Sequence, residues 1–167
     1  MEISPDTPCR LNLGAGNKRM EGWLAVGLEE QHEVRCDIRS IPLPDACADE
    51  ALACHVVEHL TPWDVVPALK EWLRLLKPGA MLALELPDLF KCCRAVLAGK
   101  GPRDGLWGLY GEPLREDELM LHRWAYSPES LSTLLREAGF VKIKLRAPQF
   151  HAQRIDRDMR IEARKPI

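Results

Sequence analysis

Short apolar runs recur along the chain at the length of buried β-strands, and segments with helical spacing separate several of them. These runs predict strands at residues 10–15, 23–28, 34–38, 50–54, 81–86 and 141–145. A last run, residues 159–163, alternates apolar and polar side chains as an antiparallel edge strand does. Alternation of strands and helices is typical of a mostly parallel sheet.

The clearest helix signal covers residues 61–77. Thr61 can cap the helix, Pro62 suits its first position, and Lys77 suits the negative end of its dipole. Pro67 lacks the backbone N–H that an internal turn needs, so we expect the regular helix to begin only there. The apolar face has helical spacing and consists of Leu69, Trp72, Leu73 and Leu76.

A second helix is predicted at residues 127–138, where the Ser-Pro pair that starts at Ser127 begins it and Gly139 ends it. A weaker helix candidate covers residues 89–98. Residues 99–118 are rich in Gly, Pro and charge and are predicted to form a long loop. Loops of this length are usually functional lids or disordered segments.

Together these elements predict an α/β fold of the Rossmann-like, doubly wound type, with a mostly parallel seven-stranded sheet and an antiparallel last strand. About seven residues separate the first two strands, whereas a parallel crossover normally needs a dozen or more. The helices of the first half are therefore expected to be reduced to turns or missing. Such a reduced half would expose apolar surface suited to a second copy of the chain, as in a homodimer. The length of 167 residues predicts a single domain, 1–167.

Composition narrows the choice of partner and compartment. The formal net charge of −2 argues against a nucleic-acid partner, and no apolar run is long enough to span a membrane. Residues 1–6 lack the pattern of a secretory signal, so we expect a cytoplasmic protein. The six cysteines show no Cys-x-x-Cys spacing and look like small core residues. From Arg136 onward nine Lys/Arg accompany four Asp/Glu, which we interpret as a solvated strand pair rather than a nucleic-acid surface.

The most informative motif lies at residues 11–17, where a short apolar strand breaks into Gly14 and Gly16. Without a Cβ, the backbone can turn sharply there and let a ligand approach the main chain closely. A glycine-rich turn after the first strand of an α/β sheet is where nucleotide-like cofactors bind. A plain tight turn is the alternative interpretation of two glycines taken alone.

Further landmarks follow this motif in a fixed order, at residues 36–39, 43–45, 51–60, 75–79, 85–88, 122–127 and 135–140. The stretch 51–60 contains a Val-x-Glu-His ending. In this order the landmarks resemble a class I S-adenosylmethionine-dependent methyltransferase, and most closely the small bacterial group related to the type 11 methyltransferase domain. The resemblance spans roughly residues 11–148.

The resemblance implies S-adenosyl-L-methionine as cofactor and S-adenosyl-L-homocysteine as product. It also implies transfer of a methyl group to oxygen or nitrogen of a small-molecule or glycan acceptor. Asp37 would accept a hydrogen bond from the adenine amino group and Ile38 would pack against the ring, although outside this context the pair would be a plain strand exit. The expected cofactor-binding residues are Leu13, Gly14, Ala15, Gly16, Asn17, Glu29, Asp37, Ile38, Cys54 and His55.

Two positions depart from the family pattern. Asn12 stands where the motif often has an acidic residue, and Gly27 stands where an acid normally holds the ribose hydroxyls. Glu29 lies two residues further on and would share the same face if the strand continued, so we expect it to substitute. Without it, the lost hydrogen bonds cost about 1.5–3 kcal/mol, or roughly ten- to hundredfold in affinity. A catalytically degenerate cofactor-binding or scaffold protein with the same fold is therefore the alternative.

Transfer to an oxygen acceptor needs a general base with a pKa near neutrality, which favours histidine. His55 and His122 are the candidates, and Tyr126 is expected to position the substrate. The alternative for residues 122–124 is a loop anchor that packs its tryptophan into the core. Two aromatic residues of the long loop, Trp107 and Tyr110, could help to close over the substrate.

Residues 55–59 also match His-x-x-Glu-His, the inverted zinc-protease motif. Such a site needs the five residues on one helix and a third protein ligand. Here the motif follows a strand-like run and precedes the helix start at Thr61, so a zinc hydrolase is the minor alternative and we assign no metal ligands. Glu58 and His59 could instead form hydrogen bonds near the helix start.

Overall fold

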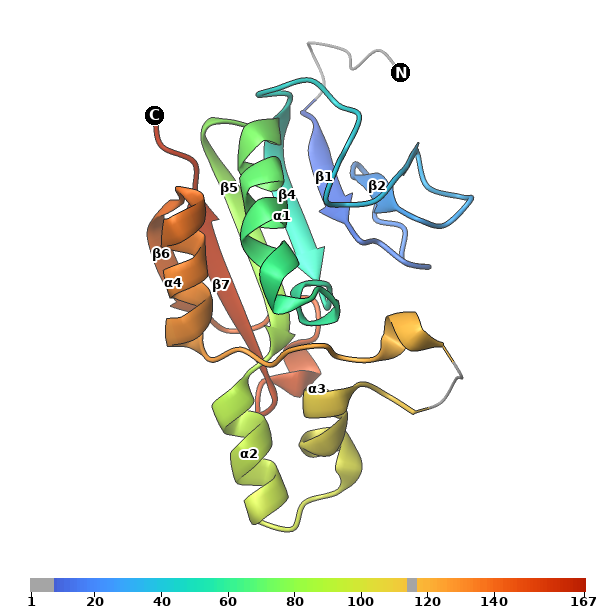
Figure 1. The fold of residues 1–167 in the computed structure, drawn as a ribbon, viewed down its shortest axis with the longest axis vertical. Coiled ribbons are helices and arrows are strands. Elements are labelled where there is room, and N and C mark those ends of the chain that lie inside the picture. The colour runs from blue at the N-terminus through green and yellow to red at the C-terminus, as the bar shows by residue number, and fades with distance from the viewer. Residues whose placement is uncertain (1–7, 114–116) are drawn as a thin grey trace.

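The computed structural model describes residues 8–113 and 117–167, which form a seven-stranded sheet. The strands are β1 Arg10–Leu13, β2 Leu24–Gly27, β3 Val34–Arg35, β4 Ala48–Cys54, β5 Leu76–Pro87, β6 Val141–Arg146 and β7 Asp158–Arg164. They lie in the order β3-β2-β1-β4-β5-β7-β6 (Figure 1). All pairings are parallel except those of β7 with β5 and β6. The predicted Rossmann-like fold with an antiparallel last strand is confirmed. That strand, β7, lies between β5 and β6, so its predicted position at the edge of the sheet is wrong.

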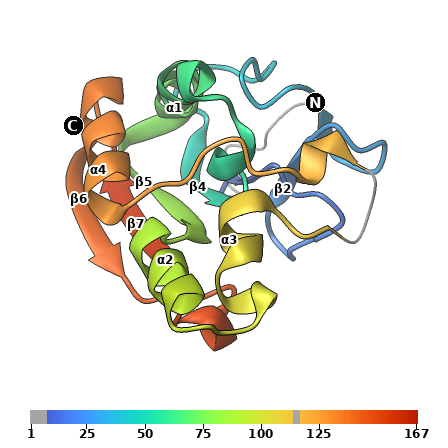
Figure 2. The ribbon, with the colours of Figure 1, turned by 60° about the horizontal axis from the view of Figure 1, so that its bottom comes forward.

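The larger helices lie against one face of this sheet and beyond one of its ends (Figure 1, Figure 2). The helices α1 (Pro62–Leu75) and α4 (Pro128–Ala138) pack side by side on the face. The helices α2 (Leu89–Leu97) and α3 (Leu106–Tyr110) pack together beyond the end of β5. Short 3₁₀ turns complete the set at η1 Val57–His59, η2 Pro102–Asp104, η3 Glu118–Met120 and η4 Ala152–Arg154. Between β1 and β4 the described residues form no helix, as the short spacing predicted.

The side chains that alternate with the core residues along the strands include several paired charges. Arg10 of β1 and Glu50 of β4 occupy paired positions, and their side chains lie 3.6 Å apart. Arg160 of β7 donates to Glu162 at 2.9 Å and to Glu85 of β5 at 2.8 Å. Ion pairs therefore lie on the sheet itself, and the expected homodimer stays a prediction.

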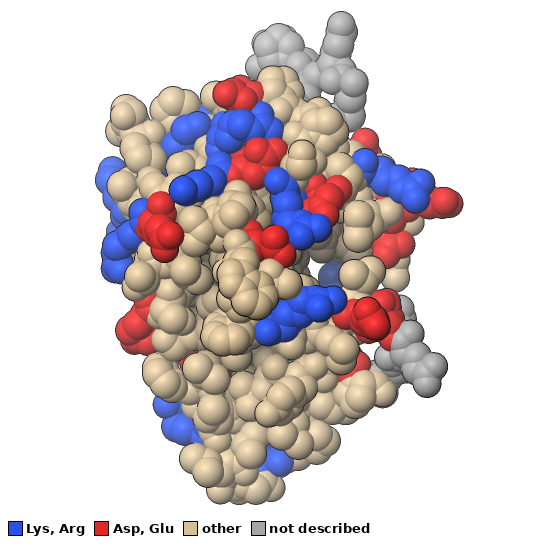
Figure 3. Space-filling model, in the orientation of Figure 1, with Lys and Arg blue, Asp and Glu red and all other residues tan. Residues whose placement is uncertain are grey.

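The basic C-terminal part differs from the predicted solvated strand pair. β6 and β7 do pair with each other, but β7 is largely buried and its Arg160 is only 4% exposed. On the face that carries α1 and α4, basic and acidic side chains intermingle rather than form a patch of one sign (Figure 3). Neither observation supports a nucleic-acid surface.

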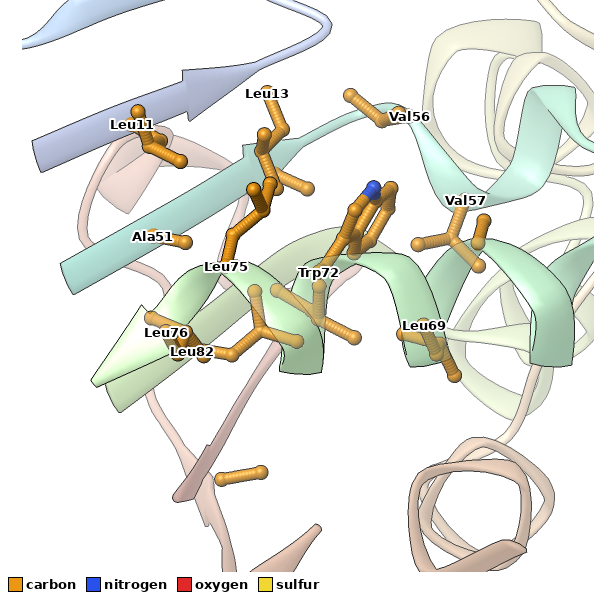
Figure 4. Packing of buried hydrophobic residues seen from close by; sticks show 14 of the residues in the cluster. Leu11, Leu13, Ala51, Val56, Val57, Leu69, Trp72, Leu75, Leu76 and Leu82 are labelled. Atoms are coloured by element: carbon orange, nitrogen blue, oxygen red, sulfur yellow. The ribbon is translucent and has the colours of Figure 1, made fainter. Parts of the chain in front are cut away.

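The main hydrophobic core lies between the sheet and α1 (Figure 4). Leu69 and Trp72 of α1 are fully buried and pack in the same cluster as Leu11 and Leu13 of β1. The Trp72 indole N–H also donates to the backbone carbonyl of Ile38 at 2.9 Å. This bond attaches the segment after β3 to the core, where no helix is available to do so.

The start and the end of α1 both differ from prediction. The helix begins at Pro62 and continues through Pro67, so the expectation that it starts only at Pro67 is wrong. Pro67 removes the bond to the carbonyl of Trp63, one turn earlier, but Trp63 is 82% exposed and water can satisfy that carbonyl. The helix ends at Leu75 because β5 begins directly at Leu76.

Residues 99–118 are not the uninterrupted loop that their composition predicted. They include η2 and α3, and α3 packs closely against α2. A Cβ on Gly108 would collide with the Sγ atom of Cys92, so glycine permits this close packing. Residues 114–116 of the expected loop lie outside the described residues.

Within the described residues, no helix has the length and hydropathy required to cross a membrane. Residues 1–6, on which the expected lack of a secretory signal rests, lie outside the described residues. The single domain 1–167 and the cytoplasmic location therefore stay predictions.

We expect Leu69→Ala to lower the free energy of unfolding by about 2–5 kcal/mol, because it removes fully buried volume from the α1 face. Leu97→Ala is the matched control, since Leu97 is 88% exposed and its truncation should change that free energy by less than about 0.5 kcal/mol. Urea denaturation followed by circular dichroism measures both values. Equal losses in the two variants would contradict the packing described.

Candidate active site

Glycine holds the loop after β1 against the end of β4. Gly14 has a φ of 65° and Gly16 a φ of 52°, both in the left-handed region that favours glycine. A Cβ on Gly14 would lie 2.6 Å from the Cγ2 atom of Val56, so only glycine allows this approach. The N–H groups of Gly14 and Ala15 donate to the carbonyl of Val26 at 2.8 and 3.3 Å. Both N–H groups are therefore used within the fold and are not free to bind a ligand.

The loop lies beside the end of β4, because β1 and β4 are neighbours in the sheet. Asn12 is buried beneath it and donates to the carbonyl of Lys18 at 3.1 Å, a bond that an acidic residue could not make. The structure therefore brings together the predicted residues 13–17 with Cys54 and His55. The surface is hollowed in this region, between the β1–β2 end of the sheet and η3 (Figure 3).

His32, which no sequence motif marks, occupies the place of the missing acid. A Cβ on Gly27 would lie 3.7 Å from the Cα of Gly14 and 2.8 Å from the Cε1 of His32. The His32 Nε2 donates to the carbonyl of Gly16 at 2.7 Å. The Nδ1 atom is buried and has no partner among the described residues. The ring thus fills the space next to Gly27, with one nitrogen left to accept a hydrogen bond.

Glu29 does not replace the acid in the predicted way. β2 ends at Gly27, so the continuing strand on which that prediction rests is not formed. Glu29 is exposed, and its backbone carbonyl accepts the N–H of His32 at 3.2 Å. Through this bond, the backbone of Glu29 helps to form the turn that contains His32.

Asp37 and Ile38 follow β3 at the same edge of the sheet. Asp37 accepts the side chain of Arg39 at 2.6 Å and the backbone N–H of Arg39 at 2.9 Å. Hydrogen bonds from Arg39 lower the pKa of Asp37, so the carboxylate is ionised at neutral pH. Arg39 also pairs with Asp64 at 3.2 Å. A ligand that donates to Asp37 therefore shares the carboxylate with Arg39.

His55 lies directly after β4, between two buried carboxylates and with a φ of 55°. Its Nδ1 is 3.0 Å from Glu58 Oε1 and its Nε2 is 3.0 Å from Asp158 Oδ2. Burial alone would lower the pKa of His55, but the bonds to Asp158 and Glu58 raise it to about 9. Both ring nitrogens then carry protons at neutral pH and neither can accept one. The surroundings of His55 do not suit the general base expected from the sequence.

A buried ion pair anchors the loop between β6 and β7 at this edge of the sheet. Glu85 of β5 accepts Arg160 at 2.8 Å, and both side chains are almost fully buried. The same carboxylate accepts the backbone N–H groups of Gln149 and Phe150 at 2.7 and 2.9 Å. The two backbone bonds to Glu85 therefore fix the loop directly before the next residue, His151.

His151 lies between the glycine loop and the end of β4. Its Nε2 accepts the side chain of Lys18 at 2.8 Å, and its Nδ1 lies 3.8 Å from the Sγ of Cys54. Burial, and then the charges of His55 and Lys18, lower the pKa of His151 to about 4. The ring is therefore neutral at pH 7 and connects two segments of the candidate site.

The remaining predicted residues come from the segment after η3. His122 donates its Nδ1–H to the carbonyl of Gly108 at 2.9 Å, and burial lowers the pKa of His122, so its Nε2 is unprotonated. Tyr126 is 2% exposed and its hydroxyl has no partner among the described residues. The hydroxyl does not face the surface in this structure, and its expected role in positioning the substrate stays a prediction. Trp124 is 55% exposed, so the alternative of a core anchor is also wrong.

A hollow of about 610 Å³ opens between α3 and η3. Its lining includes Trp107, Tyr110, Met120 and Leu121. Apolar and aromatic linings are typical of sites for small organic molecules. The two aromatic residues that were expected to close over a substrate thus share one hollow.

The His-x-x-Glu-His motif at residues 55–59 does not form a zinc-protease site. It consists of a strand end followed by η1, rather than a single helix. Both nitrogens of His55 are bound to carboxylates, whereas the ring of His59 lies edge to face with His122, with centroids 4.8 Å apart. The two histidines of the motif do not converge on one ion.

Residues 12–84 match the family model of the methyltransferase domain. Among solved structures, an S-adenosylmethionine-dependent methyltransferase from Methanosarcina mazei is similar, with a TM-score of 0.69 at 14% identity over 100% of both chains. The resemblance to class I methyltransferases, related to the type 11 domain, is confirmed. A comparison with curated protein sequences gave no match.

Two further methyltransferases share the fold. One from Thermotoga maritima, described as a possible histamine N-methyltransferase, has a TM-score of 0.66 at 18% identity over 94% of this chain and 82% of its own. The 1,6-didemethyltoxoflavin-N1-methyltransferase of Burkholderia thailandensis has a TM-score of 0.63 at 22% identity over 96% of this chain and 72% of its own. That enzyme was crystallised with 1,6-didemethyltoxoflavin and S-adenosylhomocysteine.

Several residues at the candidate site of this methyltransferase-fold chain carry no sequence signal. His151 reaches Cys54 across 97 positions, and His32 stands in an ordinary polar turn. Glu58 and Glu85 did give a signal, because each acid interrupts an apolar run. A charge in such a run predicts a buried group that is paired.

Asp158 confers a specific acid dependence of stability. Burial alone would raise the pKa of Asp158, but hydrogen bonds from His55 and Arg157 lower it from 3.8 to about 2. A carboxyl group whose pKa is lower in the folded than in the unfolded state stabilises the fold at pH values above its unfolded-state pKa. This stabilisation is lost as the pH falls through about 2. Between about pH 5 and pH 2, we expect the free energy of unfolding to fall by about 2 kcal/mol more in the wild type than in Asp158→Asn, measured by urea denaturation. Equal falls would contradict the described contacts.

Proposed function

We propose that this chain is an S-adenosyl-L-methionine-dependent methyltransferase that acts on a small-molecule acceptor. The observation that carries the proposal is the approach of Gly14 to Val56, which places a glycine loop at the carboxyl ends of β1 and β4. When bound, the cofactor supplies an activated methyl group and leaves as S-adenosyl-L-homocysteine. The match of residues 12–84 to the methyltransferase domain gives independent support.

The residues present suit a nucleoside cofactor at three points. A Cβ on Gly16 would meet no atom within 4 Å, so the backbone of the loop is open to a ligand. The unpartnered Nδ1 of His32 suits a ribose hydroxyl as donor, and the ionised Asp37 suits the adenine amino group. These residues follow β1, β2 and β3, which are neighbours in the sheet. Ile38 follows Asp37, and Cys54 ends β4 beside β1, so both would complete the lining.

Lys18 suits the carboxylate of the methionine part of the cofactor. It follows the glycine loop, and its ammonium group is oriented by His151 at 2.8 Å. Bonds between an ammonium group and a carboxylate are among the strong hydrogen bonds of proteins. His55 acts differently, because its bonds to Glu58 and Asp158 fix the end of β4. The chain then contributes mainly position and exclusion of water to the reaction.

The hollow between α3 and η3 supports an acceptor with an apolar or aromatic part. Trp107 and Tyr110 offer ring surfaces there, and Leu121 offers an aliphatic one. A glycan acceptor is the alternative within the same reaction. Identification of the methylated product would distinguish a small-molecule acceptor from a glycan. It would also show whether oxygen or nitrogen is methylated.

A protein that binds the cofactor without turnover is the second candidate. It is favoured by Gly27, which leaves no acid for the ribose hydroxyls, and by the absence of a free base at His55. Calorimetric titration with both forms of the cofactor, followed by an acceptor screen read by mass spectrometry, separates the two candidates. Binding with a methylated product supports the enzyme, and binding without product supports the second candidate. No binding at millimolar cofactor contradicts both.

We expect His32→Ala to weaken binding of S-adenosyl-L-homocysteine about tenfold, since one hydrogen bond of about 1.4 kcal/mol is lost. Glu29→Ala is the matched control from the same turn and should leave the affinity unchanged, because its side chain is exposed. Calorimetric titration measures both constants. A loss in Glu29→Ala with none in His32→Ala would restore the strand-based expectation and remove His32 from the site.

A further inference from the structure

Glu58, His59 and His122 form a cluster that the proposed cofactor site does not use. One ligand atom of each, a carboxylate oxygen or a ring nitrogen, lies within 4.8 Å of the others. Two of the residues belong to η1 and the third follows η3, so the cluster joins segments that are far apart in the chain. Glu58 is buried and the two histidines are half-buried, which leaves the cluster accessible from solvent.

Glu58 has a buried carboxylate oxygen that nothing in the described structure satisfies. The residue is 2% exposed, and its Oε1 accepts the Nδ1–H of His55 at 3.0 Å. Its Oε2 is buried without a hydrogen-bond partner among the described residues. Leaving such an oxygen unsatisfied is costly, whereas a bound cation would satisfy it.

Both histidines are held in a tautomer that suits a metal ion. His59 donates its Nδ1–H to the carbonyl of Leu121 at 3.2 Å, and His122 donates its Nδ1–H to the carbonyl of Gly108 at 2.9 Å. A carbonyl can only accept, so each Nε2 keeps a free lone pair. Metal-binding histidines typically donate their other ring N–H to a carbonyl in this way.

We propose that Glu58, His59 and His122 bind a divalent transition-metal ion, with Zn²⁺ the best-matched metal. Two imidazole nitrogens and one carboxylate oxygen are a donor set that Zn²⁺ takes. Three protein ligands leave a fourth position for water or for a donor atom of a substrate. This donor set differs from the His-x-x-Glu-His site, because His55 is not part of it.

The other group of potential ligands, Cys54, His55 and His151, lacks these properties. Both nitrogens of His55 are bound to carboxylates. The Nε2 of His151 accepts from Lys18. A metal ion there would have to break existing contacts, whereas at Glu58 it would satisfy an unpaired oxygen.

The proposed ion would connect η1 to one wall of the hollow between α3 and η3. Leu121 lines that hollow, and its carbonyl orients His59. The Nε2 of His122 cannot accept a proton while it binds the ion, so this role replaces the general base expected from the sequence. Metal binding does not depend on the cofactor, and the two proposals can fail separately.

Titration of the chelator-treated protein with Co²⁺ and Zn²⁺, in the absence of cofactor, tests the site. We expect one ion to bind per chain. Bound Co²⁺ should show the visible absorption typical of a site with few nitrogen and oxygen ligands, and Zn²⁺ should displace it. Zn²⁺ should also raise the melting temperature. Absence of binding at millimolar metal would overturn the proposal.

Variants locate the ion. His59→Ala and His122→Ala should each weaken Zn²⁺ binding about a hundredfold or more, while circular dichroism shows that both still fold. These half-buried residues are preferred over Glu58, whose replacement could disturb the contact with His55. His151→Ala is the matched control from the other group and should keep the wild-type affinity. Loss of binding in His151→Ala, with none in His59→Ala, would place the ion elsewhere and refute the assignment.

Discussion

The close approach of Gly14 to Val56 is the contact on which the candidate site depends. Leu13 of β1 is paired with Ala53 of β4, so the two strands end at the same level. Any side chain at position 14 would push the glycine loop away from the end of β4, where His55 lies. The contact is with the side chain of Val56, so the loop and the residues after β4 pack together as one edge.

Buried charges organise what surrounds that edge. Glu85 holds the loop that carries His151, and Glu58 and Asp158 hold His55 from two sides. Burying a charge is costly, and each of these charges has an opposite charge or a hydrogen-bond donor next to it. A sheet that lacks the helices of its first half is thus fixed at its functional end by polar contacts. The unsatisfied oxygen of Glu58 is the exception, and this is why it points to a ligand.

Features that depend on local periodicity could be predicted from the sequence, and features that depend on tertiary contacts could not. The strands and the helices α1 and α4 follow from apolar spacing and end signals, and Gly14 follows from its place after the first strand. The predicted place of Glu29 on a continuing strand is wrong, because nothing in the local pattern shows that β2 stops at Gly27. His32 and His151 reach the site through a turn and a long loop, so their proximity is a property of the fold alone.

The edge formed by the glycine loop is where we propose that a sulfonium nucleoside binds. A crystal structure grown with S-adenosyl-L-homocysteine in large excess tests it most directly. We expect the nucleoside along the ends of β1, β2 and β3, with a ribose hydroxyl on the Nδ1 of His32. An empty crevice, closed by the rings of His32 and His151, would contradict it.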